Sequence, residues 1–153
     1  MSMFQSMNIT STALTSQRLR MDVISSNMAH VDTTRGKMVD GEWQPYKRKM
    51  VVMQPKNNSF SSFLQMAMGS KDSHTVGDGV KVTKIIEDEN TPFKSVYDPL
   101  HPDANAEGYV DLPNVDPLRE MVDLMSATRS YEANVTAFNA SKAMMMKALE
   151  IGK

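Results

Sequence analysis

The sequence predicts an α+β fold in which two long terminal helices pair as a coiled coil and a small β-rich domain is inserted between them. Two long segments near the chain ends lack glycine and proline, and apolar residues recur in both with helical spacing. Nearly all the glycines and prolines fall between these segments. We expect residues 1–33 to form the first helix, 34–115 the middle domain and 116–153 the second helix.

The N-terminal helix is expected from Ser6 to Val31. Apolar residues recur every seven positions along it, which is the spacing of a coiled-coil seam: Met7, Leu14, Met21 and Met28. The remaining positions are rich in Ser, Thr and Asn, which are mediocre helix formers. We therefore expect this helix to depend on packing against another helix or another chain.

The C-terminal helix is expected to begin at Pro117, because Asp116 is a favoured N-cap and proline is favoured at the first helical position. Gly152 suits its end. The helix would be about 51 Å long, whereas a compact domain of this size has a radius of gyration of about 15 Å. We therefore expect it to project and to need partner chains. A series with alternating steps of three and four runs along it, in which Thr128 and Lys142 are polar and the other seven positions are apolar: Met121, Leu124, Tyr131, Val135, Phe138, Met145 and Leu149.

Three consecutive methionines near the end of this helix cannot all face one seam, because neighbouring helical residues point about 100° apart. Met145 continues the seam, and Met144 and Met146 flank it on either side. Methionine suits adaptable interfaces because its side chain is flexible and polarizable. We expect neighbouring subunits to cover Met144 and Met146.

The middle segment, residues 34–115, is expected to hold the strands. One strand is expected from Tyr46 to Gln54 and another from Val80 onward, entered by a turn at residues 77–79. A short strand followed by an ordered loop is expected within residues 91–114. Residues 57–73 form a Ser/Asn-rich insert, for which a loop and a short helix both remain open.

Composition argues against several classes of function. The chain has 17 Lys and Arg against 18 Asp and Glu, so it lacks the net positive charge that would attract nucleic acid. The absence of cysteine excludes disulfides, thiolate catalysis and Cys-ligated metals. The sequence contains no run of about 18 apolar residues, the length that a membrane-spanning helix needs. Its N-terminus lacks the pattern of a cleaved secretory signal. The basic residues 47–49 would alternate across a strand, which favours a solvated strand or a partner contact over a nucleic-acid site.

Candidate chemical sites are weak. Residues 103–114 partly match a calcium loop, but Asn114 stands at the twelfth position, where a bidentate Glu is required. His30, His74 and His101 have no metal-motif spacing, although His101 near Asp98 and Asp103 could be imagined as an acid/base group. We prefer the interpretation that His101 is simply a polar residue of a loop, without a catalytic role. We expect no enzyme activity, no cofactor, no bound metal and no small-molecule substrate.

Two segments resemble the flagellar axial proteins, the family of rod, hook and hook-associated subunits. Residues 24–36, ISSNMAHVDTTRG, are similar to its N-terminal signature, with His30 in place of the usual second Asn. Residues 97–116, YDPLHPDANAEGYVDLPNVD, are similar to a hallmark of proximal-rod members. We expect Asn27 and Asn134 to make buried polar contacts that fix register, as a single amide can in coiled coils. The residues carrying the resemblance are Asn27, Ala29, Thr33, Gly108, Tyr109, Pro113, Asn114 and Asn134.

The resemblance implies a structural subunit of the proximal rod, the hollow drive shaft that crosses the bacterial periplasm and encloses the export channel. The terminal helices would form a coiled-coil inner tube. The implied partners are other rod proteins, adjacent basal-body components, copies of itself and, during secretion, the flagellar type III export apparatus. Export would require no cleaved signal peptide.

A soluble helical export chaperone or adaptor that binds a partner helix is the alternative. Such a protein would be helical and monodisperse alone. A rod subunit would instead have frayed, protease-sensitive ends around a resistant core at residues 34–115. An enzyme would need a titrating group whose replacement abolishes turnover, and the sequence offers none.

Overall fold

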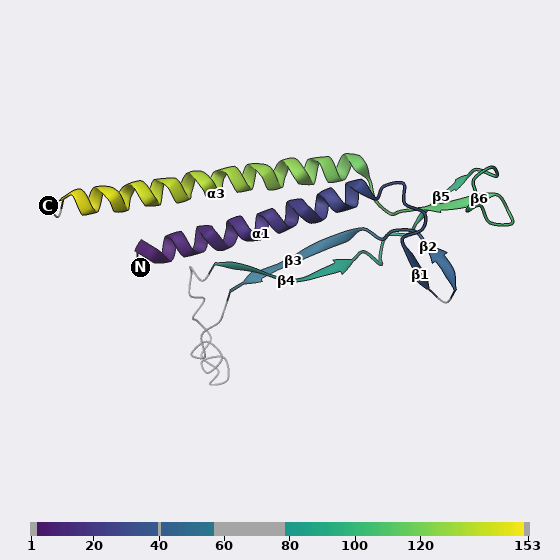
Figure 1. The fold of residues 1–153 in the computed structure, drawn as a ribbon, viewed down its shortest axis with the longest axis horizontal. Coiled ribbons are helices and arrows are strands. Elements are labelled where there is room, and N and C mark those ends of the chain that lie inside the picture. Colours follow the sequence, from purple (N-terminus) through teal and green to yellow (C-terminus); the bar gives the residue numbers. More distant parts are fainter. Residues whose placement is uncertain (1–2, 40, 57–78, 152–153) are drawn as a thin grey trace, which may run out of the picture.

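The computed structural model describes residues 3–39, 41–56 and 79–151 of the chain. Helix α1, Met3–Ala29, and helix α3, Pro117–Ile151, run side by side in opposite directions along the long axis of the molecule (Figure 1). The two predicted terminal helices and the α+β class are therefore confirmed. Supercoiled pairing of these helices stays a prediction. Among the described residues, no helix combines the length and the apolar character needed to span a membrane.

Helix α3 begins where the sequence predicts. The Asp116 side chain accepts a hydrogen bond from the backbone N–H of Leu118 at 3.0 Å, which satisfies one of the unpaired donors at the helix start. The backbone carbonyl of Asp116 accepts the first helical bond, from Glu120. The expected stop at Gly152 lies outside the described residues.

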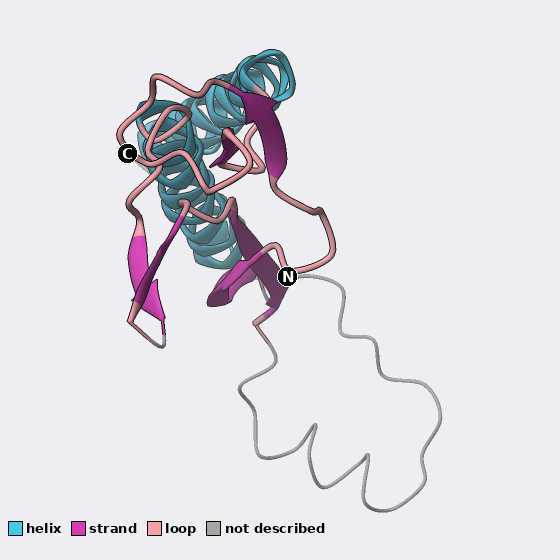
Figure 2. Cartoon of the chain, turned by 90° about the vertical axis from the view of Figure 1, so that its right-hand side faces the viewer, coloured by secondary structure: helices cyan, strands magenta, loops and turns pink. Residues whose placement is uncertain are grey.

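The described part of the middle segment contains three separate two-stranded antiparallel sheets, which do not merge into one sheet (Figure 2). The β3–β4 pair lies along α1, and the two shorter pairs project near the end where α1 stops and α3 starts (Figure 1). The strands are β1 Lys37–Val39, β2 Glu42–Gln44, β3 Lys49–Pro55, β4 Val80–Glu87, β5 Lys94–Tyr97 and β6 Tyr109–Leu112.

The strand predictions were partly correct. Strand β4 begins at Val80 as expected, and Gly79 before it has a positive φ of 80°. The preceding positions of the expected turn lie outside the described residues, as does the insert at 57–73. Strand β3 begins at Lys49 rather than at Tyr46, because the segment before it serves polar contacts described below. The β1–β2 hairpin was not predicted, and neither was β6, which occupies part of the expected loop.

The small core gathers where the second half of α1 meets the start of α3. The buried apolar residues of the described ranges are Val23, Ile24, Tyr46, Val110, Val115 and Ala127, together with Pro45 and Pro113. Few apolar side chains are fully buried, so α1 and α3 meet mainly through partly buried side chains, and the β3–β4 pair lies along α1.

Gly36 brings the segment after α1 against the start of the segment leading to β3. Its N–H donates to the Gln44 carbonyl at 2.8 Å, and a Cβ at this position would stand 2.7 Å from both the Cα and the N of Tyr46. These are backbone atoms, which cannot move aside to relieve the clash as the tip of a side chain can. Glycine is therefore required here for close approach of two backbones.

We expect Gly36→Ala to lower the free energy of unfolding by about 1–3 kcal/mol, because the new methyl group meets backbone rather than open space. Urea unfolding followed by circular dichroism measures this change. Gly41→Asn is the matched control, since its φ is 91°, its Cβ would meet nothing within 4 Å, and Asn tolerates this conformation. Equal stability of Gly36→Ala and the wild type would show that the two segments can separate at no cost.

Candidate subunit interface

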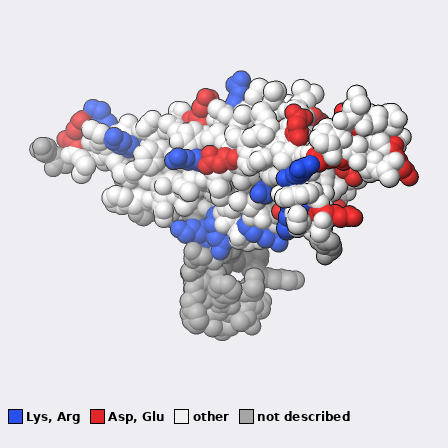
Figure 3. All heavy atoms as spheres, turned by 45° about the vertical axis from the view of Figure 1, so that its right-hand side comes forward, with Lys and Arg blue, Asp and Glu red and all other residues white. Residues whose placement is uncertain are grey.

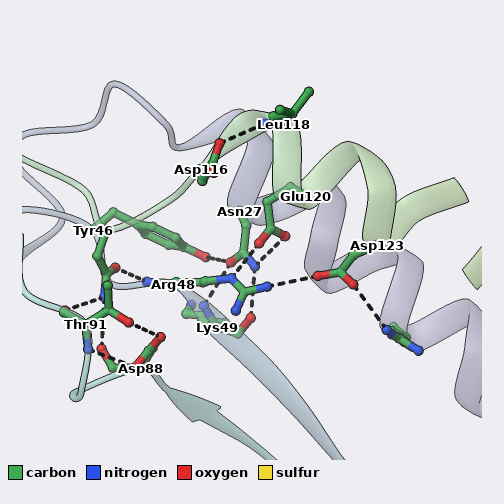
Figure 4. Close-up of polar contacts among 12 residues, drawn as sticks. Asn27, Tyr46, Arg48, Lys49, Asp88, Thr91, Asp116, Leu118, Glu120 and Asp123 are labelled. Carbon is green, nitrogen blue, oxygen red and sulfur yellow. Dashed lines mark hydrogen bonds and ion pairs between the residues drawn. The ribbon is translucent and has the colours of Figure 1, made fainter. Parts of the chain in front are cut away.

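Asn27, near the end of α1, is the centre of a buried polar cluster (Figure 4). Its side chain is 1% exposed and makes four hydrogen bonds. The amide NH2 donates to the Lys49 carbonyl at 2.9 Å and to Glu120 Oε2 at 3.1 Å. The amide oxygen accepts from the Lys49 N–H at 2.9 Å and from the Tyr46 hydroxyl at 3.0 Å. One amide thus joins α1 to the first residue of β3 and to α3, and its expected role in fixing register stays a prediction.

A buried ion pair extends this cluster. Glu120, in the first turn of α3, is fully buried, and its Oε1 accepts from Arg48 Nε. Arg48 also donates to Asp123 Oδ2 at 3.1 Å, and Asp123 lies 3.6 Å from Arg20 of α1. Positive and negative side chains alternate in this series of ion pairs. Each buried charge therefore has a partner, and the pairing offsets the cost of desolvation. The cluster therefore fixes the position of β3 relative to both helices (Figure 4).

Asn114 links Arg48 to the segment that follows β4. Its oxygen accepts from the Arg48 N–H at 2.7 Å, and its NH2 group donates to the Asp88 and Thr91 carbonyls, each at 3.0 Å. Asp88 in turn accepts from the Thr91 hydroxyl at 2.8 Å, and this bond lowers the pKa of the Asp88 carboxyl below its ordinary value of 3.8. The asparagine of the Pro-Asn-Val stretch thus holds three chain segments together.

The residues of the supposed calcium loop have structural partners. Asp103 binds the guanidinium of Arg35 and accepts from the Thr34 hydroxyl at 2.8 Å, and these hydrogen bonds lower the pKa of Asp103. Asn105 accepts from the backbone N–H groups of Glu107 and Tyr109. Within the described ranges, no group of three or more His, Asp or Glu side chains is arranged to hold a metal ion.

The other residues of the family resemblance fall into different settings. Gly108 has a φ of 82°, and Tyr109 packs edge-on against Tyr97 at 5.3 Å between ring centres. Pro113 is buried and Ala29 is exposed. Thr33 bonds to His30, and its carbonyl accepts from the Tyr46 N–H.

Asn134 does not join the two helices. Its amide donates to the Ser130 carbonyl of its own helix at 2.7 Å. An asparagine side chain within a helix can bond in this way to the carbonyl four residues before it. The bond of Asn134 in the single chain is thus local to α3, and its expected role in fixing register stays a prediction.

Among the basic residues 47–49, Arg48 differs from expectation. Arg48 is 9% exposed and belongs to the cluster, so it is neither solvated nor available to a partner. Lys49 lies 5.3 Å from the ring centre of Tyr46, a distance at which a cation is attracted to the ring face. No local pattern in the sequence marks Arg48 as buried, because its partner Glu120 lies 72 positions away.

Most of the predicted seam residues are partly buried in the single chain, and their contacts with neighbouring subunits stay a prediction. They are Met7, Leu14, Met21 and Met28 on α1, and Leu124, Tyr131, Val135, Phe138 and Met145 on α3. Thr128 of α3 reaches the sulfur of Met21 at 3.6 Å, which shows the two helices facing each other at this level.

Two predicted seam positions lie elsewhere. Met121 is 50% exposed, because Glu120 beside it takes the inward position. Leu149 is 75% exposed, because α3 continues past the start of α1 and has no facing helix there (Figure 1). Met144 and Met146 are 60% and 55% exposed on either side of the partly buried Met145, the arrangement expected for them.

Charged side chains of both signs are spread over the visible face, at the end where α3 stops as well as near the small hairpins (Figure 3). Large apolar side chains are exposed at both ends of α3. The set is Leu118, Met121, Val122, Met125, Met144, Met146, Leu149 and Ile151, each at least 50% exposed. An apolar surface of this extent on a chain with a small core is typical of a subunit that assembles with other chains.

Comparison with known proteins agrees with this class. The family model described as "Flagellar basal body rod FlgEFG protein C-terminal" matches residues 106–151. The chain is 64% identical over 153 residues, covering all of both chains, to the flagellar basal-body rod protein FlgC of Bacillus subtilis (strain 168). It is 44% identical over 158 residues to FlgC of Borreliella burgdorferi, covering 99% of this chain and 98% of that one. It is 42% identical over 153 residues, covering all of both chains, to FlgC of Escherichia coli O6:H1.

The chain belongs to the FlgC family of flagellar basal-body rod proteins. It is a structural subunit of the rod, and its place is the flagellar basal body. The resemblance to the axial proteins is thereby confirmed.

We expect Arg48→Met to lower the free energy of unfolding by about 3–5 kcal/mol, because Glu120 would remain buried without its cation. The double variant Arg48→Met with Glu120→Leu should recover part of this loss. Arg129→Met, at an exposed position of α3, is the control and should change stability by about 0.5 kcal/mol or less. Urea unfolding of the four proteins measures these effects. A double variant less stable than Arg48→Met would contradict the role of the ion pair.

The lowered pKa of Asp88 predicts an acid-sensitive contribution to stability. Because this pKa is lower in the folded chain than in the unfolded one, the contribution is present above pH 3.8 and is lost as pH falls through the folded value. Asp88→Asn should therefore lose less stability than the wild type between pH 7 and pH 3. Asp22→Asn, exposed on α1, should behave as the wild type does. Thermal unfolding at the two pH values makes the comparison, and an unchanged acid loss in Asp88→Asn would overturn it.

Proposed function

We propose that this protein polymerises with other rod proteins and with copies of itself in the proximal rod, the hollow drive shaft that transmits torque across the periplasm and encloses the export channel. In this proposal α1 and α3 form part of a coiled-coil inner tube, and the three small sheets lie outside it. The observation that carries the proposal is the exposed apolar surface of α3, together with the full-length likeness to FlgC.

The physical requirements of a drive shaft fit this surface. A shaft that resists shear needs many lateral contacts, and densely packed apolar helices supply stiff contacts of this kind. Methionines at Met144 and Met146 can adapt to neighbours that are not identical to one another. The protein would act mechanically, with no catalytic, cofactor-binding or nucleic-acid-binding role and no insertion into the membrane.

Delivery to the rod would use the flagellar type III export apparatus, without a cleaved signal peptide. A narrow export channel admits a chain that unfolds readily, and the small core described above suits that requirement. Helices rich in moderate helix formers would then gain most of their order from neighbouring subunits. The chain would pass from a marginally stable exported form to a rigid assembled one.

Lysine at Met144 or Met146 should impair assembly while sparing the fold of the subunit, because both side chains are exposed in the single chain. Met145→Lys is the matched control, since its side chain is partly buried against the chain itself and its replacement should lower the thermal unfolding temperature. Circular dichroism gives the stability, and swimming together with isolation of basal bodies gives assembly. Unimpaired swimming with Met144→Lys and Met146→Lys would argue against neighbours at these positions.

A further inference from the structure

The β3–β4 pair has one face on which lysines gather. The register pairs Lys84 with Val52 and Lys81 with Gln54. Cross-strand partners share a face, and side chains alternate along a strand, so Lys81 and Lys84 lie on the same face. The pairing continues one residue past β3, which places Lys56 on this face as well. We name these three lysines the basic face.

The basic face is not neutralised by the acidic residues of its own strands. Glu87 is the one acidic residue within β3 and β4, and it pairs with Lys49, which alternation places on the opposite face. That opposite face is turned toward α1, because Val51 and Met53 line a cavity there together with Val23. Within the described part of the chain, the lysines of the basic face form no ion pair, since those found join other residues.

The β5–β6 hairpin has an exposed face of the opposite charge. Its register pairs Ser95 with Asp111 and Tyr97 with Tyr109, so these four side chains lie away from the buried Val110. The Ser95 hydroxyl donates to the exposed Asp111 carboxylate at 2.5 Å and holds it in place. The two tyrosines pack edge-on and are 64% and 43% exposed. The face thus combines a fixed carboxylate with aromatic surface.

The loop between β5 and β6 adds to this negative charge. Asp98 and Glu107 are exposed in it, whereas Asp103 is already bound by a guanidinium. Lys94 is the one basic residue between positions 88 and 118, and alternation places it on the other face of the hairpin from Asp111. We name the exposed face of β5–β6 and this loop the acidic hairpin.

The acidic hairpin cannot reach the basic face of its own chain. The hairpin projects beyond the end of β4 at Glu87 (Figure 1). Lys81 lies six residues before that end, which is about 20 Å at roughly 3.3 Å per residue. The two surfaces can therefore meet only when they belong to different chains.

We propose that the acidic hairpin of one subunit docks on the basic face of a second copy of this chain. Two acidic hairpins would repel each other, as would two basic faces, whereas the unlike surfaces attract. A lysine ammonium group is also attracted to the face of an aromatic ring such as Tyr97 or Tyr109. The partners contribute different surfaces, so the contact is heterologous and can repeat from copy to copy. This inference rests on the proposed rod function and places the contact in the small sheets, apart from the terminal helices.

Charge reversal tests the contact in the full-length chain, expressed as the sole copy in flagellated cells. Lys81→Glu with Lys84→Glu should lower the amount of the chain in isolated basal bodies by about fivefold or more, because carboxylates would face carboxylates. Glu107→Lys with Asp111→Lys should have the same effect. All four substitutions in one chain restore opposite charges and should return the amount to within about twofold of the wild type.

Lys37→Glu with Lys47→Glu is the matched control. It changes the net charge as much as the substitutions on the basic face do, but both positions lie outside the two surfaces. This control should leave the amount in basal bodies unchanged. Thermal unfolding of each purified variant shows whether its fold is retained.

Disulfide cross-linking decides the question if a charge-reversed variant does not fold. The chain has no cysteine, so Lys81→Cys with Glu107→Cys carries one thiol on each surface. Oxidised basal bodies should then give dimers and longer species on non-reducing gels. Lys47→Cys with Glu107→Cys, the control, should not give them. Equal cross-linking in both variants, or none in either, would overturn the docking.

The outcomes also separate this inference from the proposed function. Normal basal-body content with Lys81→Glu and Lys84→Glu would overturn the docking and leave the rod function intact. A loss that the four combined substitutions do not restore would also overturn it, because the basic face would then bind a component other than this chain. Absence of the wild-type chain from basal bodies would instead overturn the proposed function itself.

Discussion

The structure depends on the buried contact among Asn27, Arg48 and Glu120. Asn27 lies in α1, Glu120 in α3 and Arg48 just before β3, and each would be costly to bury without its polar partners. Hydrogen bonds and paired charges have direction, so they fix how β3 meets the helix pair in a way that apolar contacts alone do not. The register of α3 against α1 and the orientation of its apolar faces follow from where Glu120 is held.

This arrangement divides the molecule into a fixed end and an open end. Near Asn27 the helices, β3 and the segment around Asn114 are joined by short polar contacts. Toward the chain termini the helices are joined mainly by partly buried apolar side chains, and α3 finally runs past α1. One end of the subunit is held by polar contacts, and the other exposes apolar side chains. This suits export followed by assembly, because the exposed apolar surface becomes buried only between chains.

The sequence predicted the helices well because their signals are local. Helical spacing, the Asp116 cap and the absence of glycine and proline act within a few residues, and the structure confirms all of them. The seam was less accurate. Spacing favoured Met121 over Glu120 because methionine is apolar, yet both fit a step of three or four to Leu124. Burial of Glu120 is possible only because Arg48 lies against it, and periodicity carries no information about such a distant partner. The β1–β2 and β5–β6 pairs were missed or incomplete because short strands carry weak patterns.

By itself, the sequence determined the α+β class, the two terminal helices, the start of α3 and the likeness to the axial proteins. It also determined that α3 is longer than α1, and hence that some apolar surface must lack a partner within the chain. The tertiary structure alone decided which surface that is. Glu120 rather than Met121 faces inward, Asn27 rather than Asn134 joins the elements, and Leu149 lies beyond the reach of α1. The physical reason is that a helix pattern fixes the spacing of a face, whereas long-range hydrogen bonds and relative helix lengths fix which face is covered.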